Sequence, residues 1–282
     1  MRNNVLSQSK LYDELYSSEY ISTLYDRHME ETFFKISDNY YFLPNLFKIC
    51  LKDRIILDIG CGGGNVGTKI IDKAEYIVNL DISFNALLHA RKKFGFKKSR
   101  YINGDVIVLP FREGSFDIVV GYCTLHHIED IDAAAKEISR VLKKDGLFLC
   151  FEPAQRYNWF EFWSDLLKIP YPITSFLKKI YLILQKKFAK RDNSVKIFKD
   201  LNLKETERHF LKTPSQYRSA FKKSDLTDIK VRTILLEFIP PRFLSINNRR
   251  FVKFIFKLSD LFHKLGIAKE KGKFIIIEAR KI

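Results

Sequence analysis

A cluster of glycines that directly follows a short apolar segment is the local pattern best suited to bind a ligand. It reads Leu57-Asp-Ile-Gly-Cys-Gly-Gly-Gly-Asn-Val-Gly67. Glycines after a strand let the backbone approach a ligand closely and then turn into a helix. The loop fits two templates: the G-x-G-x-x-G of dinucleotide binders, at Gly62, Gly64 and Gly67, and a D-x-G-x-G-x-G pattern that begins at Asp58. The glycines alone do not choose between these templates.

Two further acids follow the next apolar segments. Asp81 comes directly after Tyr76-Ile-Val-Asn-Leu80, and Asp105 follows the short segment Tyr101-Ile-Asn. Ligands of open α/β sheets bind outside the carboxyl ends of the strands. We therefore expect Asp58, Asp81 and Asp105 to lie along the same crevice as the glycine loop.

The elements that must position these residues alternate regularly along the chain. Strands are predicted over 54–59, 76–80, 101–103, 116–120 and 147–151, and helices over 66–73, 132–142 and the stretch through Lys93 that Ser83 can cap. The alternation resumes with a helix over 215–223 and strands over 229–238 and 273–279. Such alternation predicts βαβ units, a parallel sheet and helices on both faces.

Composition narrows the class of protein. The 282 residues are 46% apolar, which is ample for a core and excludes wholesale disorder. No apolar run reaches the roughly 18 residues of a membrane span, and the N-terminus has no secretory h-region, so we expect a cytoplasmic protein. The four cysteines form no CxxC pair, which argues against a disulfide scaffold or a metal site.

Five motifs in order resemble the class I S-adenosylmethionine-dependent methyltransferases, in particular their broad small-molecule branch. They are DIGCGGG, LDIS, GDVIVLPFREGSFDIVV, LHHIED and EISRVLKKDGLF, and the resemblance covers about 45–153, 214–238 and 272–282. It implies a Rossmann-like, mostly parallel sheet of seven strands with an antiparallel last strand. It also implies S-adenosylmethionine as cofactor.

The residue types suit that cofactor. S-adenosylmethionine has no phosphate, so Asp58 can neutralise its ammonium group beside the glycines, whereas a pyrophosphate would gain nothing from this carboxylate. Asp81 can accept the ribose hydroxyls. The resemblance implies that Asp105 takes the adenine amino group and that the N–H of Val106 contacts the ring. The expected cofactor-binding set is Asp58, Gly60, Cys61, Gly62, Gly64, Asp81, Ile82, Asp105, Val106 and Tyr122.

The segment after the fourth strand, Gly121-Tyr-Cys-Thr-Leu-His-His-Ile-Glu-Asp130, supplies candidates for catalysis. A sulfonium is already a strong electrophile, so the protein must mainly align the acceptor and exclude water. A base helps when the acceptor is a hydroxyl, and His126 or His127 could serve because imidazole titrates near neutrality. The alternative is that one histidine packs under the loop and the other bonds only to backbone.

The domain boundaries follow from where the alternation is interrupted. We expect a helical cap over 1–45, a core over 46–153, 214–238 and 272–282, and helical lid insertions over 154–213 and 239–271. The formal net charge is +16, and residues 1–150 hold 20 bases and 20 acids, so the whole excess lies in the C-terminal part. Phe251, Phe254, Ile255, Leu258, Leu261, Phe262 and Leu265 follow helical spacing among lysines and arginines, as in a basic amphipathic helix.

These features lead to a functional hypothesis with alternatives. The protein is expected to transfer a methyl group to an oxygen or carbon acceptor on a small, lipid-like, lipid-linked or acidic molecule. The basic lids either only cover the core or meet an anionic membrane surface, which would make the protein peripheral at the membrane. Nucleic acid is a less favoured partner, since no RRM, KH or OB signature is present. The remaining alternatives are an RNA-modifying methyltransferase and a non-catalytic cofactor-binding protein.

Overall fold

The computed structural model describes residues 2–29, 42–95, 97–154, 210–234 and 274–282, together with a few isolated positions. The chain divides into two compact units. The first comprises Met1–Pro153, Glu205–Val231 and Ile276–Ile282, and the second comprises Ala154–Lys204 and Arg232–Ile275. Most of the second unit, and with it most of the two predicted lids and the amphipathic helix over 249–265, lies outside the described residues.

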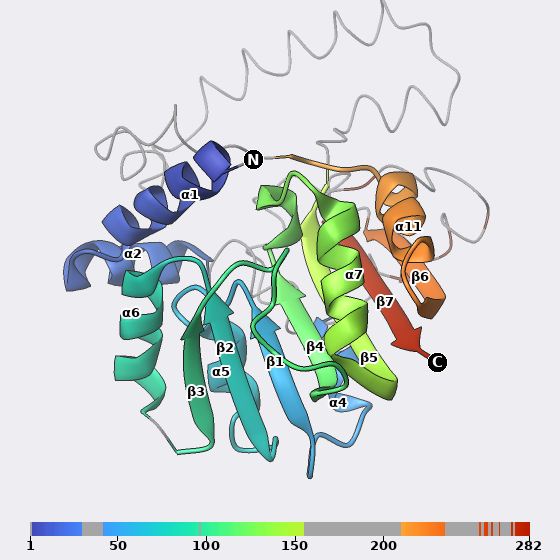
Figure 1. The fold of residues 1–282 in the computed structure, drawn as a ribbon, viewed down its shortest axis with the longest axis horizontal. Helices are drawn as coiled ribbons and strands as arrows, with labels where there is room; N and C mark the ends of the chain where they lie inside the picture. The colour runs from blue at the N-terminus through green and yellow to red at the C-terminus, as the bar shows by residue number, and fades with distance from the viewer. Residues whose placement is uncertain are drawn as a thin grey trace, which may run out of the picture. The chain divides into compact units, whose positions relative to one another are not determined.

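A seven-stranded sheet forms the centre of the fold (Figure 1). Its order is β3-β2-β1-β4-β5-β7-β6, and β7 runs antiparallel in the otherwise mostly parallel sheet. The strands are β1 (Ile55–Ile59), β2 (Tyr76–Asp81), β3 (Ser99–Asn103), β4 (Phe116–Tyr122), β5 (Leu142–Pro153), β6 (Leu226–Ile234) and β7 (Phe274–Lys281). The predicted α/β class, the seven strands and the antiparallel last strand are confirmed.

Helices cover both faces of this sheet. In Figure 1, α7 and α11 lie in front of the strands, whereas α4 and α5 lie behind them. The described helices are α1 (Arg2–Leu15), α2 (Glu19–Met29), α4 (Phe42–Phe47), α5 (Asn65–Ile70), α6 (Phe84–Phe94), α7 (Ile131–Val141) and α11 (Pro214–Lys222), with a 3-10 turn η2 (Leu125–His127). Helices therefore pack on both faces of the sheet, as in other α/β folds.

Side-chain caps fix where three of the helices begin. Ser83 accepts the N–H of Ala86 at the start of α6, and Asp130 accepts that of Ala133 at the start of α7. Thr213 begins α11 with a complete capping box. Ser83 lies two residues after the end of β2 and Asp130 lies three residues after the end of η2, so these caps also set the paths of the loops that border the candidate site.

The sheet is buried on both faces, as the continuous apolar strand sequences predict. In the centre, β1 pairs with both β2 and β4, and Leu57 lies opposite Val78 and Val119. Leu57, Val119 and Phe148 are fully buried. This rigid centre holds the carboxyl ends of β1, β2 and β4 in fixed relative positions, which is the requirement for a site built from their loops.

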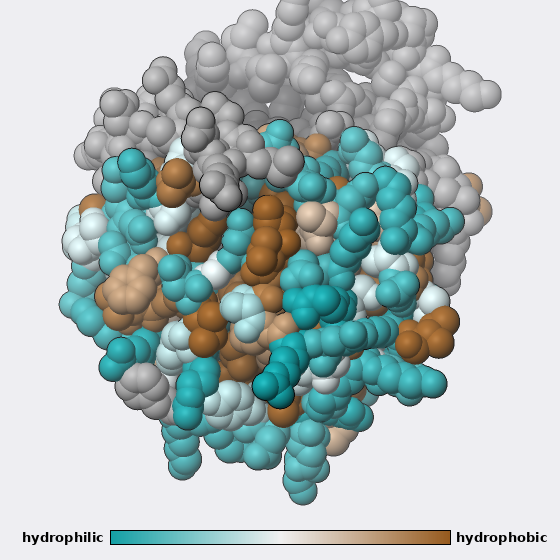
Figure 2. Space-filling model, viewed as in Figure 1, coloured by the Kyte–Doolittle hydropathy of each residue, from teal (hydrophilic) through white to brown (hydrophobic). Residues whose placement is uncertain are grey.

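Apolar side chains also reach the surface near the carboxyl ends of the strands. Figure 2 shows brown, apolar side chains gathered in the centre of the viewed face, within a largely teal surface. Among the described residues, Val108 is 71% exposed and Phe84 is 58% exposed. None of the described helices is long and apolar enough to cross a membrane.

Candidate active site

The glycine loop leaves β1 with three glycines in the left-handed region of backbone space. Gly60, Gly62 and Gly64 have φ of 61°, 50° and 76°. A side chain on Gly60 would collide with Thr124, because a Cβ atom there would lie 2.3 Å from the Thr124 Cγ2. The loop therefore needs glycine both for its backbone angles and for its close approach to the segment that follows β4.

Asp58 places an uncompensated carboxylate beneath this loop. It lies on β1 and is only 1% exposed, and neither of its carboxylate oxygens has a hydrogen-bond partner in the described structure. Burial and the nearby charge of Asp81 raise the pKa of Asp58 well above its ordinary value. A buried acid with two unused acceptor oxygens in a cavity wall is suited to a cationic ligand group.

Asp81 lies at the end of β2, beside the same loop. Its Oδ2 accepts the N–H of Gly62 at 2.8 Å, and its Oδ1 accepts the N–H of Ser83 at 2.8 Å. Burial raises its pKa from 3.8 to about 6, although these backbone hydrogen bonds favour the ionised form. Each carboxylate oxygen can accept a further hydrogen bond, so Asp81 remains able to bind hydroxyl groups.

These residues border a cavity of about 1180 Å³, part of which is open to solvent. Of the predicted cofactor-binding set, all but Gly64 line it: Asp58, Gly60, Cys61, Gly62, Asp81, Ile82, Asp105, Val106 and Tyr122. Further lining residues come from the segment after β4 and from the N-terminal helices.

Gly64 is the residue of the predicted set that packs against a neighbouring helix. A Cβ atom at this position would lie 2.0 Å from the Phe94 ring and 3.1 Å from Ala90. Gly64 thus allows α5 to pack closely against α6, and it does not border the cavity. The sequence pattern does not separate a glycine that approaches a ligand from one that approaches a helix.

Cys61 is the thiol of the glycine loop. It is buried, and burial followed by the charges of Asp81 and Asp58 raises its pKa well above the ordinary value. Since the thiolate is the reactive form, this environment suits a small packing residue and not a nucleophile. Among the described residues, no cluster of three His, Cys, Asp or Glu side chains could hold a metal ion.

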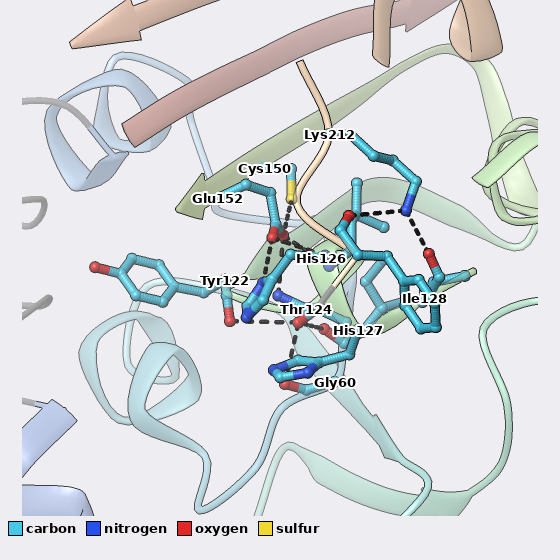
Figure 3. A network of polar contacts seen from close by, with 12 residues as sticks. Gly60, Tyr122, Thr124, His126, His127, Ile128, Cys150, Glu152 and Lys212 are labelled. Carbon is cyan, nitrogen blue, oxygen red and sulfur yellow. Dashed lines mark hydrogen bonds and ion pairs between the residues drawn. The ribbon is translucent and has the colours of Figure 1, made fainter. Parts of the chain in front are cut away.

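His126 lies below the cavity and is bound to Glu152. It is 5% exposed and is not among the lining residues. Its Nδ1 lies 2.7 Å from the Glu152 carboxylate, to which it donates a hydrogen bond, and Figure 3 shows the two groups facing each other. This geometry favours a structural role for His126 and leaves His127 as the histidine that borders the cavity.

Glu152 holds the whole segment that follows β4. It is fully buried, and its carboxylate accepts the N–H groups of Thr124, Leu125 and His126 at 2.8–3.1 Å. Burial acts to raise its pKa, but the hydrogen bond and charge of His126 and these backbone N–H groups outweigh burial and lower the pKa. Glu152 is thus an ionised anchor that fixes the path of the chain into His127.

Lys212 secures the far side of the same segment. Its ammonium group donates to the carbonyl oxygens of Ile128 and Phe210, as the dashed lines in Figure 3 mark. The N–H of Phe210 in turn donates to the carbonyl of His126 at 2.6 Å. Phe210 lines the cavity, so the short segment before α11 forms part of the site wall.

The first helix is the part of the site that the sequence patterns did not predict. Gln8, Tyr12 and Tyr16 of the α1 region follow one another at intervals of four residues, and all three line the cavity. The Gln8 amide donates to the carbonyl of His127 at 2.9 Å, and the Tyr16 hydroxyl accepts the N–H of Gly63 at 2.9 Å. The i, i+4, i+8 spacing of these polar residues was the available signal.

A second face of α1 binds the start of α6. The Asp13 carboxylate accepts the Ser83 hydroxyl at 2.7 Å and the N–H of Asn85 at 3.1 Å. The Ser9 hydroxyl donates to the carbonyl of Ile82 at 3.2 Å. As a result α1 is bonded to the loop after β1, the loop after β2 and the segment after β4.

A family model described as a methyltransferase domain matches residues 57–150. This segment is a methyltransferase domain of the S-adenosylmethionine-dependent type. The cofactor of such a domain is S-adenosylmethionine, and the cavity of this methyltransferase domain fits it: Asp58 offers an unpartnered buried carboxylate to a cationic group, and Asp81 offers acceptor oxygens to hydroxyls.

Curated relatives of the methyltransferase domain differ in activity. The chain is 30% identical over 129 residues to a mitochondrial arginine-hydroxylase, NDUFAF5 of Danio rerio, covering 45% of this chain and 38% of that protein. It is 32% identical over 108 residues to the demethylmenaquinone methyltransferase of Staphylococcus aureus, covering 37% of this chain and 45% of that protein. The chain thus spans less than half the length of these two relatives.

A solved structure has a similar fold over nearly the whole chain. It is a complex between the Haloferax volcanii Trm112 methyltransferase activator and a methyltransferase, with a TM-score of 0.59 at 15% identity. The match covers 95% of this chain and 96% of that chain. At this level of identity the likeness is one of fold.

Proposed function

We propose that this protein transfers the methyl group of S-adenosylmethionine to an oxygen or carbon nucleophile of a small, apolar, lipid-like molecule held in the same cavity. The observation that carries the proposal is the pair of acids at the ends of β1 and β2. Asp58 would hold the amino-acid ammonium of the cofactor, and Asp81 would hold its ribose hydroxyls. The demethylmenaquinone methyltransferase among the relatives acts on a compound of this general kind and supports the proposal.

The remaining roles of the chain's residues follow from their positions. Bound S-adenosylmethionine supplies an electrophilic methyl group. Asp105 and Val106 lie where they could contact its adenine ring, and Tyr122 lines the wall beside the glycine loop. Glu152 fixes the segment that carries His127, and His127 takes up the proton that a hydroxyl acceptor loses.

The wall of the cavity favours an uncharged acceptor over an acidic one. Away from the glycine loop it includes Ile107, Ile128 and Phe210 together with tyrosines of the N-terminal helices. Its ionisable side chains include the carboxylates of Glu129 and Asp130, which would repel an anionic group. An apolar acceptor with one hydroxyl or one activated carbon therefore suits the described part of this wall.

Isotope transfer tests the proposal. The protein is incubated with methyl-labelled S-adenosylmethionine and, separately, with a panel of quinols and phenols, a lipid extract, and bulk RNA. We expect label in an organic-soluble small molecule with an equimolar yield of S-adenosylhomocysteine. Label in RNA would support the nucleic-acid alternative, and a product that gains oxygen in place of a methyl group would place the protein with the hydroxylase relative.

A further inference from the structure

The imidazole of His127, which borders the cavity, contacts the hydroxyl group of a second lining residue, Tyr12. Its Nδ1 is buried, and its Nε2 lies 2.9 Å from the hydroxyl oxygen of Tyr12. The Tyr12 and His127 rings meet edge to face, with centroids 5.6 Å apart and planes at 82°. A neutral imidazole carries its proton on one ring nitrogen, so either the Tyr12 hydroxyl donates to Nε2 or an Nε2–H donates to the Tyr12 oxygen, depending on the tautomer of His127.

Tyr12 is held firmly in this position. Four residues before it, Gln8 bonds to the backbone carbonyl of His127, and one residue after it, Asp13 bonds to Ser83 and Asn85. Helix α1 is thus bonded to the backbone of His127 and to the start of α6, so the Tyr12–His127 distance does not depend on a single contact. Tyr12 and His127 both line the cavity, so their contact lies at the wall of the space that we propose for the acceptor.

We propose that Tyr12 is a catalytic residue that relays the acceptor's proton to His127; this inference rests on the proposed function. As the acceptor oxygen forms its bond to the methyl group and the sulfur–methyl bond breaks, the acceptor O–H proton moves to the Tyr12 oxygen. The phenolic proton of Tyr12 moves at the same time to Nε2 of His127. The products are the methyl ether, a neutral tyrosine, an imidazolium and the neutral thioether form of the cofactor.

The neighbouring candidates do not offer this path. His126 donates through Nδ1 to Glu152 and does not line the cavity. The Tyr16 hydroxyl accepts the N–H of Gly63, and burial raises its pKa well above the ordinary value. Tyr25 also lines the cavity, but its ring packs edge-on against Tyr16 with centroids 5.8 Å apart. Among the described contacts, it is the hydroxyl of Tyr12 that lies within hydrogen-bond distance of an imidazole bordering the cavity.

The tautomer of His127 tests the relay without a known acceptor. Long-range proton–nitrogen spectra of histidine-labelled protein are recorded near neutral pH, with and without S-adenosylhomocysteine. The relay requires an unprotonated Nε2 and a protonated Nδ1 on His127. A protonated Nε2, whether in the neutral tautomer or in an imidazolium that persists to alkaline pH, would overturn the proposal, because Nε2 could not then accept a proton.

Tyr12→Phe supplies the second measurement, with Tyr20→Phe as the matched control, because Tyr20 lies on α2, is 76% exposed and does not line the cavity. Tyr12→Phe should move the Nε2 resonance of His127 and lower kcat by ~100-fold or more for a hydroxyl acceptor, with KM and the S-adenosylhomocysteine Kd within about threefold of wild type. Tyr20→Phe should leave the resonance and kcat near their wild-type values. An unmoved resonance or an unchanged kcat in Tyr12→Phe refutes the relay, whereas a wild-type protein that does not bind S-adenosylhomocysteine refutes the proposed function instead.

Discussion

The carboxylate of Asp81 accepts the backbone N–H of Gly62 at 2.8 Å and so joins the end of β2 to the glycine loop that leaves β1. The other oxygen of the same carboxylate accepts the N–H of Ser83, which begins α6. One buried acid therefore fixes two of the loops that would surround the cofactor. Because Asp81 also lines the cavity, its charge serves both the fold and the ligand.

Removing either carboxylate at the strand ends should weaken cofactor binding. Asp58→Asn removes the charge that would pair with the ammonium, and Asp81→Asn removes an ionised acceptor for the ribose hydroxyls. Hydrogen bonds to charged groups are worth roughly 1.5–3 kcal/mol, so the Kd for S-adenosylhomocysteine should rise about 10- to 100-fold by calorimetry. Asp132→Asn, at an exposed ion pair with Lys223, should leave the Kd unchanged, and equal Kd values in all three variants would contradict these roles.

Affinity for S-adenosylhomocysteine should rise with pH. Burial raises the pKa of Asp81 to about 6, so this acid holds a proton in the cofactor-free protein below that pH, and burial also raises the pKa of Asp58 well above its ordinary value. The ligand favours the ionised forms, and binding releases protons. The Kd should fall by up to about tenfold per pH unit for each acid that must ionise, and calorimetry in two buffers of different ionisation enthalpy should detect the released protons.

The folding stability of the cofactor-free protein should change in the opposite direction, falling as pH rises. An acid whose folded pKa is raised from 3.8 to about 6 makes the cofactor-free protein less stable as pH rises through that interval. Saturating S-adenosylhomocysteine should reduce this loss. A pH-independent Kd with no proton release would contradict the burial of ionisable carboxylates at the site.

Gly64 and Gly114 make a matched pair that separates packing from backbone strain. Both have positive φ, 76° and 64°, but a Cβ atom on Gly64 would collide with Phe94, whereas one on Gly114 would meet no atom within 4 Å. Gly114→Ala should cost only the strain of about 1–2 kcal/mol, and Gly64→Ala should cost at least ~2 kcal/mol more in urea unfolding. Equal losses in the two variants would show that the contact of α5 with α6 is not tight at Gly64.

Glu152→Gln should destabilise the protein strongly. The substitution places an amide N–H₂ against N–H donors and removes the charge opposite His126, at a fully buried position. Breaking such a buried pair costs about 3–5 kcal/mol, measured by urea unfolding. Because the pKa of Glu152 is lowered in the folded state, its stabilisation is present above the ordinary carboxyl pKa and is lost as pH falls through the lowered value.

Glu113→Gln provides the control for this effect. Glu113 is 76% exposed in its ion pair with Lys281, and a pair of this kind contributes about 0–1 kcal/mol. Similar losses of stability in Glu152→Gln and Glu113→Gln would mean that the Glu152 network does not hold the segment after β4.

Local sequence patterns predict the parts of the fold that depend on interactions between residues near one another in the chain, such as helix caps. Ser83 was expected as a helix cap and does cap α6, because a hydroxyl before a helical segment satisfies a free N–H wherever the helix packs. The fifth strand was predicted over 147–151 but spans Leu142–Pro153. The added residues Lys143 to Asp145 lie at the more exposed end of the strand. Lys143 forms an ion pair with Asp117 on β4, and no local sequence pattern predicts this contact.

The contacts that complete the site join residues far apart in the sequence. Glu152 and His126 are 26 positions apart, and Tyr12 and His127 are 115 positions apart. Each pair forms only because the sheet brings the ends of β4 and β5 together and because α1 crosses the loops above them. Sequence spacing identified the acids at strand ends since those acids share one sheet edge, but it could not assign separate roles to the two adjacent histidines.

Calorimetric titration of the wild-type protein with S-adenosylhomocysteine and, separately, with NAD shows whether the site takes a nucleoside without a phosphate. We predict one S-adenosylhomocysteine per chain with a Kd that depends on Asp81, and no heat of binding with NAD, because the Asp58 carboxylate would repel a pyrophosphate over the glycine loop. Saturable binding of NAD without binding of S-adenosylhomocysteine would contradict this prediction.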